Sequence, residues 1–510
     1  MSIIKSSILI SFLSLIISVI SFFSQLLIAK YFGASKSMDF YLYSTSIPLL
    51  FSAIITSSLS YSFTPFLIRI RVEANQNYQQ FLGYLYLKSI ISSIILFTLL
   101  FGILVLVGYK EVSVNYNYSL DYFIGIVFFS CLTAIVNIQN SILICIYNSQ
   151  KSFILPTIFS IFPYILTIVF VILFHNKWSS FSIVIGLFIG SLITLIFSHL
   201  FLNQKVSFSK LSSINPIEIN SYLKKLPAIA IAMLCFTVYQ SIDSFWAPRL
   251  GFSNFSYLSY CQRIIIAFGT LVIVGPSTVL IPRLTLSIAE GRKNDFLNDT
   301  VAVLKIIIAL SSLLAVICSL LSKNIVELLF ERGEFSPIDT LGVASILPFM
   351  LFGMVFMITV VMLFRSFFAS NTNNYVVILG ISATLFYFIF SGIGSYFFGL
   401  KGIAISYLAS WILIFLISLL LIFKNDFRLI LNKQTIKFFL NQLLLLAIVF
   451  ISVYVIKVLF DFYIDNNFKL KSFLILIISG AIGVLTYLIF STKIIKQVEI
   501  IVFLNKIGIK

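Results

Sequence analysis

Residues 82–108 read LGYLYLKSIISSIILFTLLFGILVLVG, and Lys88 is the single charged residue among them. A run of about 20 apolar residues is long enough to cross a bilayer as a helix. Inside lipid every backbone polar group must be paired, which only helices and closed barrels achieve. Because the run is continuous rather than alternating, it predicts a transmembrane helix and not a barrel strand.

Similar runs follow one another along the 510-residue chain, and the polar segments between them are too short to form a domain. We therefore predict an all-α integral membrane protein with about fourteen transmembrane helices. The first run is too long for a signal-peptide core, so we expect it to be retained. The helices are expected at residues 7–29, 40–67, 82–108, 121–147, 153–174, 181–201, 222–247, 254–281, 299–322, 338–368, 373–397, 401–423, 436–460 and 470–491.

Composition supports this interpretation and excludes several classes of protein. The chain is 60% hydrophobic and only 10% charged, and its net charge is +17. The basic residues lie mainly in short loops, about twice as many on one side of the predicted membrane as on the other, which places both termini in the cytoplasm. With no soluble domain to carry a basic surface, we expect no nucleic acid as a partner.

Cofactor and metal sites are not expected either. No glycine-rich phosphate loop of the ATPase type is present, so transport would draw on a monovalent cation or on the membrane potential. All five cysteines fall inside apolar runs without metal-type spacing, and we interpret them as small buried hydrophobic residues. They are Cys131, Cys145, Cys235, Cys261 and Cys318.

Three short segments recur at a nearly constant offset along the chain. The offsets are 218, 217 and 221 for these pairs: 29–35 (AKYFGAS) with 247–253 (APRLGFS), 64–67 (TPFL) with 281–284 (IPRL), and 147–150 (YNSQ) with 368–371 (FASN). These offsets correspond to six predicted helices. They therefore predict two homologous halves that have the same orientation in the membrane. In such transporters the substrate path lies between the halves.

This repeat defines the expected organisation of the chain. We predict six-helix bundles at residues 1–205 and 215–425, related by a pseudo-two-fold axis, with two additional helices at 436–491. Residues 492–510 alternate lysine with apolar residues and predict a cytoplasmic amphipathic tail. The mixed segment 323–334 is expected to lie on the membrane surface.

Ionisable residues inside a membrane cost on the order of 2.5–3.5 kcal/mol each and usually face a cavity or a partner. The clearest example is Arg263, which lies well inside the predicted helix 254–281. Its planar guanidinium suits a phosphate bidentately. The alternative is a structural ion pair with Asp243. For Asp39, Asp243 and Lys30, an interfacial position with the charged group reaching towards water is the competing interpretation.

Three motifs together resemble the MurJ (MviN) lipid II flippase family of the multidrug/oligosaccharidyl-lipid/polysaccharide (MOP) exporter superfamily. They are AKYFGA at 29–34 followed by Asp39, YCQR at 260–263 continuing to TVLIPRL at 278–284, and LLFERGEF at 328–335. The resemblance implies that Arg263 lines a central cavity and that Asp39 is the acidic residue opening the second helix. The family's cavity arginines on the first two helices are replaced here by Ser18, Ser24 and Ser52, and its neighbouring acidic residues by Gln25 and Ser57.

The resemblance implies a flippase that moves an undecaprenyl-diphosphate-linked glycan, lipid II for peptidoglycan synthesis, by alternating access in the bacterial inner membrane. The expected substrate-binding residues are Arg263, Asp39, Asp243, Lys30, Ser18, Ser24 and Ser52. We expect a monomer surrounded by membrane lipids and associated with cell-wall synthesis proteins.

Three other functions stay open on the sequence. One is a Wzx-like flippase for O-antigen or exopolysaccharide repeat units, because the serine replacements imply a less cationic cavity. Another is a cation-coupled multidrug exporter of the same superfamily. A membrane glycosyltransferase or polymerase would need carboxylates or a basic pair in a large external loop, and no loop here is large.

Overall fold

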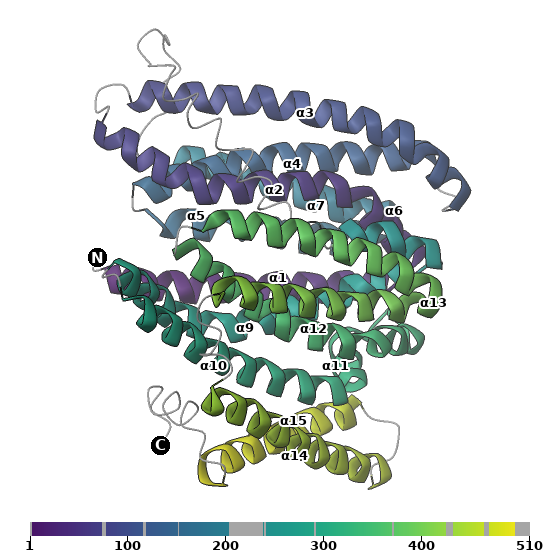
Figure 1. The fold of residues 1–510 in the computed structure, drawn as a ribbon. Coiled ribbons are helices and arrows are strands. Elements are labelled where there is room, and N and C mark those ends of the chain that lie inside the picture. Colours follow the sequence, from purple (N-terminus) through teal and green to yellow (C-terminus); the bar gives the residue numbers. More distant parts are fainter. Residues whose placement is uncertain are drawn as a thin grey trace. The chain divides into compact units, whose positions relative to one another are not determined.

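The computed structural model is helical throughout the residues it describes (Figure 1). These are residues 3–73, 78–115, 119–150, 152–202, 238, 241–289, 292–369, 372–424, 432–463 and 469–494. The chain divides into two compact units, Met1–Pro248 and Arg249–Lys510, and each is described by itself.

Helix α4 (Leu120–Ser149) is the centre of the first unit. Helices α2 (Lys36–Glu73), α3 (Tyr78–Asn115) and α7 (Phe181–Leu200) pack against it. Its buried face mixes apolar with small polar side chains, and Asn140 donates to the Ser191 carbonyl of α7 at 3.0 Å. Helix α1 (Ile3–Phe32) packs on α5 (Ile154–Phe159) and α6 (Phe162–Trp178), and α6 pairs with α7.

Helix α12 (Pro337–Ala369) has the same central position in the second unit. It packs against α9 (Asn254–Ala289), α10 (Lys293–Leu320), α11 (Ser322–Phe330) and α13 (Asn373–Ile422). Helices α14 (Lys433–Tyr463) and α15 (Lys469–Ile489) lie side by side and attach through α10 and α11 (Figure 1).

Eleven segments among the described residues are long and apolar enough to cross a membrane. One of them, Asn374–Ile422, holds both helices predicted at 373–397 and 401–423. The predicted helix 254–281 is α9. Most of the predicted helix 222–247 and most of the tail 492–510 lie outside the described residues. The prediction of an all-helical membrane protein is confirmed, and fourteen helices agree with this arrangement.

Helix α13 is a hairpin rather than one straight helix. Its 50 residues would extend about 75 Å at 1.5 Å per residue, far beyond a hydrocarbon core of about 30 Å. The chain reverses at Gly399, whose φ of +57° is costly for any residue with a Cβ atom. The two arms then approach so closely that a Cβ on Gly394 would lie 2.6 Å from the Gly402 carbonyl oxygen.

The same backbone bend occurs between α6 and α7. Ser179 has φ 46° and ψ −139°, against φ 57° and ψ −136° at Gly399, 220 residues further on. The pair Gly33 and Gly251, aligned by the sequence repeat, also share positive φ, at 55° and 114°. These recurrences support two related halves. The exact limits of the halves and of the C-terminal additions stay a prediction.

One local prediction needs revision. The single helix expected at 153–174 is two helices, α5 and α6, because Pro163 in the first turn of α6 has no N–H to continue the preceding helix. The segment 323–334 contains α11, which packs on α12 and α15 and buries Ile325, Val326 and Phe330. Its position on the membrane surface stays a prediction.

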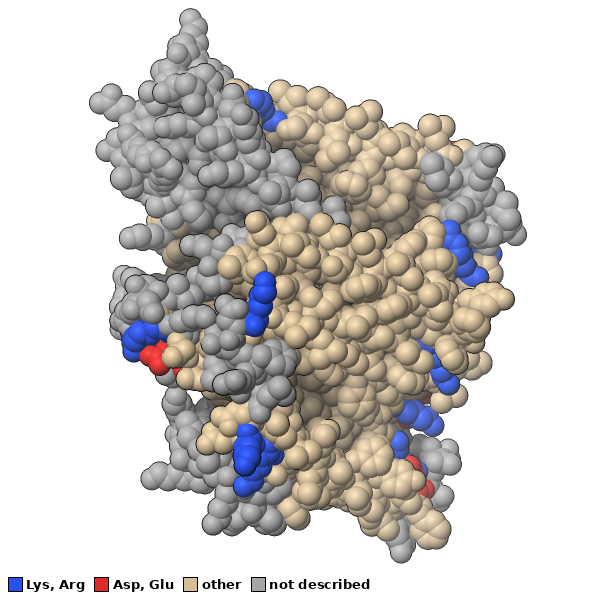
Figure 2. Space-filling model, in the orientation of Figure 1, with Lys and Arg blue, Asp and Glu red and all other residues tan. Residues whose placement is uncertain are grey.

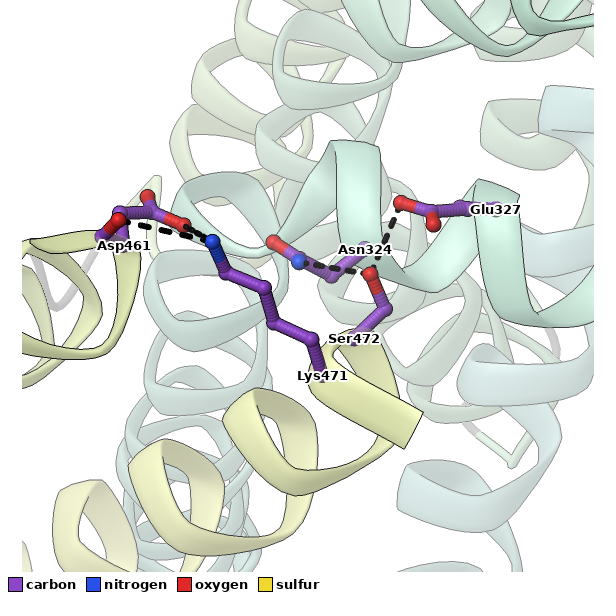
Figure 3. Close-up of polar contacts among 5 residues, drawn as sticks. All are labelled: Asn324, Glu327, Asp461, Lys471 and Ser472. Atoms are coloured by element: carbon purple, nitrogen blue, oxygen red, sulfur yellow. Dashed lines mark hydrogen bonds and ion pairs between the residues drawn. The ribbon is translucent and has the colours of Figure 1, made fainter. Parts of the chain in front are cut away.

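Polar contacts attach the two C-terminal helices to α11 (Figure 3). The Ser472 hydroxyl of α15 accepts a hydrogen bond from the Asn324 amide at 3.2 Å and donates to the Glu327 carboxylate at 2.8 Å. Beside it, Lys471 of α15 lies 3.6 Å from the Asp461 carboxylate at the end of α14. Asn324 and Ser472 are buried, so the hydrogen bond between them is shielded from water, whereas the Asp461 carboxylate that faces Lys471 is exposed.

We expect Ser472→Ala to lower the free energy of unfolding by about 1–3 kcal/mol, because the buried Asn324 amide and the half-buried Glu327 carboxylate would each lose a partner. The measurement is thermal unfolding of the purified protein in detergent. Ser319→Ala is the matched control, since the Ser319 hydroxyl donates only within its own helix, to the Val316 carbonyl. Equal melting temperatures for the two variants would show that the α11–α15 contact carries no stability.

Candidate transport site

Arg263 lies about two and a half turns into α9 and is half-buried. Its guanidinium carbon is 5.5 Å from the ring centroid of Tyr260, three residues earlier on the same helix face. Tyr260 is itself fully buried between Phe330 and Phe335, with ring centroids 5.0 and 5.3 Å away. A cation held over an aromatic face keeps its charge and a fixed orientation.

The segment LLFERGEF, the most specific part of the family resemblance, builds the support for this arginine. Its Phe330 and Phe335 form the aromatic cluster under Tyr260. Gly333 turns the chain with φ 62°, and Glu331 accepts a hydrogen bond from the Thr340 hydroxyl at 2.6 Å. The segment therefore packs against α9 and bonds to α12.

Asp339 completes this junction between α9 and α12. Its carboxylate caps the start of α12 by accepting from the Ser336 N–H at 2.8 Å, and it accepts from the Tyr257 hydroxyl of α9 at 3.0 Å. A carboxylate at a helix N-terminus is stabilised by the helix dipole. Arg263 thus lies on a helix whose N-terminal end is fixed to α12.

Asp39 and Lys30, both predicted substrate-binding residues of the first unit, differ in burial. Asp39, in the first turn of α2, has none of its surface exposed. Lys30, at the end of α1, is exposed and holds its ammonium 5.2 Å from the centroid of the Tyr31 ring. Of the two, Lys30 alone has the geometry of a side chain that reaches the headgroup region.

The three serines at the family's arginine positions have different surroundings. Ser24 and Ser52 are buried, and the Ser52 hydroxyl faces the Ala134 carbonyl of α4 at 3.4 Å. Ser18 is exposed, and its hydroxyl donates to the Ser14 carbonyl one turn earlier. Among the residues that the structure describes, no hydrogen bond joins any two of these three hydroxyls, and their role as substrate ligands stays a prediction.

Asp243 lies in the helical residues 241–246 and is fully buried. It belongs to the first compact unit, whereas Arg263 belongs to the second. The ion pair between them, and the cavity between the halves, therefore stay predictions.

Sequence reasoning did not single out Lys305. It lies twelve residues into α10, inside the span Asn294–Leu320, and is buried with its ammonium 5.5 Å from the centroid of the Phe438 ring. The helix predicted at 299–322 begins only six residues before Lys305, so the sequence does not distinguish this lysine from the basic residues of the preceding loop. The observation that identifies Lys305 as a residue inside the span is that α10 begins at Lys293, twelve residues earlier.

Lys305 lines a groove of about 420 Å³ formed by α10, α12, α13 and α14 within the second unit. Apart from Lys305, Ser312, Thr435 and Gln442, the lining is apolar and includes Leu304, Phe352, Phe356, Phe415, Phe439 and Leu446. Such a groove suits a hydrocarbon chain, and Lys305 is the one charged residue among the described residues that line it.

No three His, Cys, Asp or Glu side chains are grouped to hold a metal ion in the part of the chain that the structure describes. Cys131, Cys145, Cys261 and Cys318 are buried free thiols, as their apolar surroundings in the sequence predicted. Cys235 lies outside the described residues.

Comparison with known families gives one match over most of the chain. A family model described as lipid II flippase MurJ matches residues 28–479. A protein of Buchnera aphidicola from Schizaphis graminum, described as a probable lipid II flippase MurJ, is 25% identical over 491 residues, covering 93% of this chain and 92% of the relative. The corresponding protein of Buchnera aphidicola from Acyrthosiphon pisum is 26% identical and covers 82% of this chain and 83% of its own.

Solved structures show the same fold. A lipid II flippase MurJ in an inward closed conformation superposes with a TM-score of 0.76 at 21% identity, covering 98% of this chain and all of that one. An inward-facing MATE family transporter of the MOP superfamily gives 0.66 at 14% identity, covering 81% of this chain and 99% of that chain. At these identities the similarity concerns the fold alone.

Proposed function

Because this chain belongs to the MurJ lipid II flippase family, we propose that it moves an undecaprenyl-diphosphate-linked glycan, the peptidoglycan precursor lipid II, across the inner membrane. The observation that carries the proposal is the family match over residues 28–479, nearly the whole chain. The many apolar spans and the fold shared with MOP transporters support it.

Arg263 is the residue we assign to the diphosphate of this cargo. Its guanidinium presents a rigid fork of donors that matches phosphate oxygens in pairs. Tyr260 and the aromatic cluster behind it hold the fork in place, so less side-chain freedom is lost when the phosphate binds.

The apolar groove of the second unit is the site we assign to part of the polyprenyl tail. Burial of each CH₂ group contributes about 0.8 kcal/mol in such a setting. The groove is built from α10, α12, α13 and α14, so it belongs to the same unit as Arg263. One unit could then hold both the charged and the apolar parts of the cargo.

We propose that the membrane potential drives the outward movement of the cargo. Each elementary charge that crosses 100 mV changes the free energy by about 2.3 kcal/mol. A diphosphate diester carries two negative charges, so outward movement from a negative interior is favoured if the protein's cations stay in place. Coupling to a monovalent cation is the other mechanism within this proposal, and both would act through alternating access.

Three serines at predicted cavity positions give a specific reason to keep a second candidate function. Ser18, Ser24 and Ser52 stand where the resemblance implies cationic cavity residues, and Ser24 and Ser52 are buried and neutral. A less cationic site would suit a lipid-linked diphosphate with a different glycan, such as an O-antigen or exopolysaccharide repeat unit.

The deciding experiment is rescue of a bacterial strain depleted of its own lipid II flippase. Growth with normal cell shape, and loss of the accumulated precursor, would support the lipid II proposal. If the chain is present in the membrane yet gives no rescue, the same test in a strain lacking its O-antigen flippase distinguishes the second candidate. Rescue of neither strain would contradict both.

We also propose that both termini lie in the cytoplasm, which the distribution of basic residues supports. Reporter tags at either terminus should then be inaccessible from outside intact cells, and a tag inserted near Lys110 should be accessible. An external C-terminus would contradict an even number of crossings.

We propose a monomer that associates with cell-wall synthesis proteins.

A further inference from the structure

We propose that a groove in the first unit, between α2 and α3, binds one glycerophospholipid, with the phosphate at Lys88 and one acyl chain along the groove. This site is separate from the cargo-binding residues above, and the inference does not depend on the identity of the cargo. It rests on the packing of α2, α3 and α4 and on a lysine at an unusual depth.

The groove exists because α2 and α3 both pack on α4 while making little contact with each other. It has a volume of about 280 Å³. Its walls are apolar side chains of all three helices, among them Ile55, Leu59, Phe63, Leu96, Ile138 and Ile142. From Leu85 to Leu96 it extends about 16 Å along α3, which is about half of the hydrocarbon core. This is the depth of one leaflet.

Lys88 supplies the positive charge on the polar side of this groove. It lies six residues inside the span Leu82–Leu106, is exposed, and donates to the Tyr84 hydroxyl at 3.0 Å. Lysine has three N–H donors, so this bond uses one of them. Because helical side chains lean towards the helix N-terminus, the ammonium points to the membrane surface where α3 begins.

Serine hydroxyls continue the polar side beyond Lys88. Ser89, Ser92 and Ser93 line the groove, and Ser92 is exposed. Ser89 donates to the Gln139 side chain of α4 at 3.0 Å, which fixes α3 against the groove floor. None of the described residues that line the groove is acidic, so its charge complements a phosphate. Figure 2 shows how sparse such cations are, with described Lys and Arg as separate patches on a mostly uncharged surface.

The size and charge of the groove favour a glycerophospholipid over other phosphate ligands. One lysine matches the single negative charge of a phosphodiester, and an apolar wall of one-leaflet depth matches an acyl chain. A free phosphate would leave that wall without an occupant. A polyprenyl chain would be much longer than the groove.

The test uses the full-length protein purified in a neutral detergent, with phosphatidylglycerol binding measured by native mass spectrometry. Lys88→Gln should weaken binding about fivefold, since one cation near an anionic lipid contributes about 1 kcal/mol. The matched control is Lys437→Gln, which removes an exposed lysine near the start of α14. If both variants weaken lipid binding equally, or if neither variant weakens it, the proposal is overturned.

A second pair of variants tests the acyl chain without changing charge. Ser92→Phe places a ring in the groove and should reduce binding, whereas Ile91→Phe, at an exposed neighbour outside the groove lining, should not. Glycerol 3-phosphate should fail to displace the lipid, because it has no chain. Displacement by glycerol 3-phosphate would show a simple anion site. Displacement by an equal concentration of a polyprenyl diphosphate would show a cargo site. Either result would overturn the proposal.

Discussion

Arg263→Ala is expected to reduce flipping about 10- to 100-fold, because a hydrogen bond to a charged group contributes about 1.5–3 kcal/mol. Loss of the guanidinium removes both the charge and the fork that we assign to the diphosphate. With Ser18, Ser24 and Ser52 in place of the family's arginines, few cations could compensate. The measurement is accumulation of lipid-linked precursor in the inner leaflet, with protein level followed in parallel.

Arg263→Lys separates charge from geometry. It keeps the positive charge but loses the planar fork, so we expect an intermediate loss of flipping, about tenfold or less. Both variants should reach the membrane, because Arg263 is half-buried and the aromatic cluster of Tyr260, Phe330 and Phe335 does not depend on its charge. A melting temperature close to the unmodified protein would confirm that the fold is intact.

The alternative role of Arg263, neutralisation of Asp243, makes the opposite prediction for a double variant. If the arginine serves only that carboxylate, Arg263→Ala combined with Asp243→Asn should restore flipping, because no buried charge is left without its partner. If Arg263 binds the cargo, the double variant should be as inactive as Arg263→Ala alone. Full activity of the double variant would remove Arg263 from the substrate site.

The helices were predictable because the length and continuity of the apolar runs determine them almost alone. The start of α13 at Asn373 and its reversal at Gly399 match the predicted helices 373–397 and 401–423. The break between α5 and α6 was missed because the apolar run continues through Pro163, and only the missing proline N–H interrupts the helix.

The candidate site was less predictable, because burial and partners depend on packing between distant segments. Nothing in the sequence near Ser52 indicates that its hydroxyl faces the Ala134 carbonyl. The motif around Phe330 carries part of the family resemblance, yet its position under Tyr260 appears only when α9 and α11 are packed together. Lys305 was missed for a related reason, since its burial depends on α14.

Gly402 should be among the positions least tolerant of substitution. A Cβ atom there would overlap the carbonyl group of Gly394 in the opposite arm of the α13 hairpin. The obstacle is backbone, so it cannot rotate away as a flexible side chain could. The arms are also joined by the Ser406 hydroxyl, which donates to the Phe390 carbonyl at 2.7 Å. Separating the arms would break that bond and open the packing around it.

We therefore expect Gly402→Val to abolish accumulation of folded protein, with a cost beyond the 1–3 kcal/mol typical of overpacking. The measurement is the yield of monodisperse protein after detergent extraction. Gly480→Ala is the matched control, because a Cβ on Gly480 of α15 meets no atom within 4 Å. Replacing a helical glycine by alanine there should leave the yield unchanged or raise stability by up to about 1 kcal/mol. Normal yield from Gly402→Val would mean that the two arms of α13 are not packed this closely in the membrane.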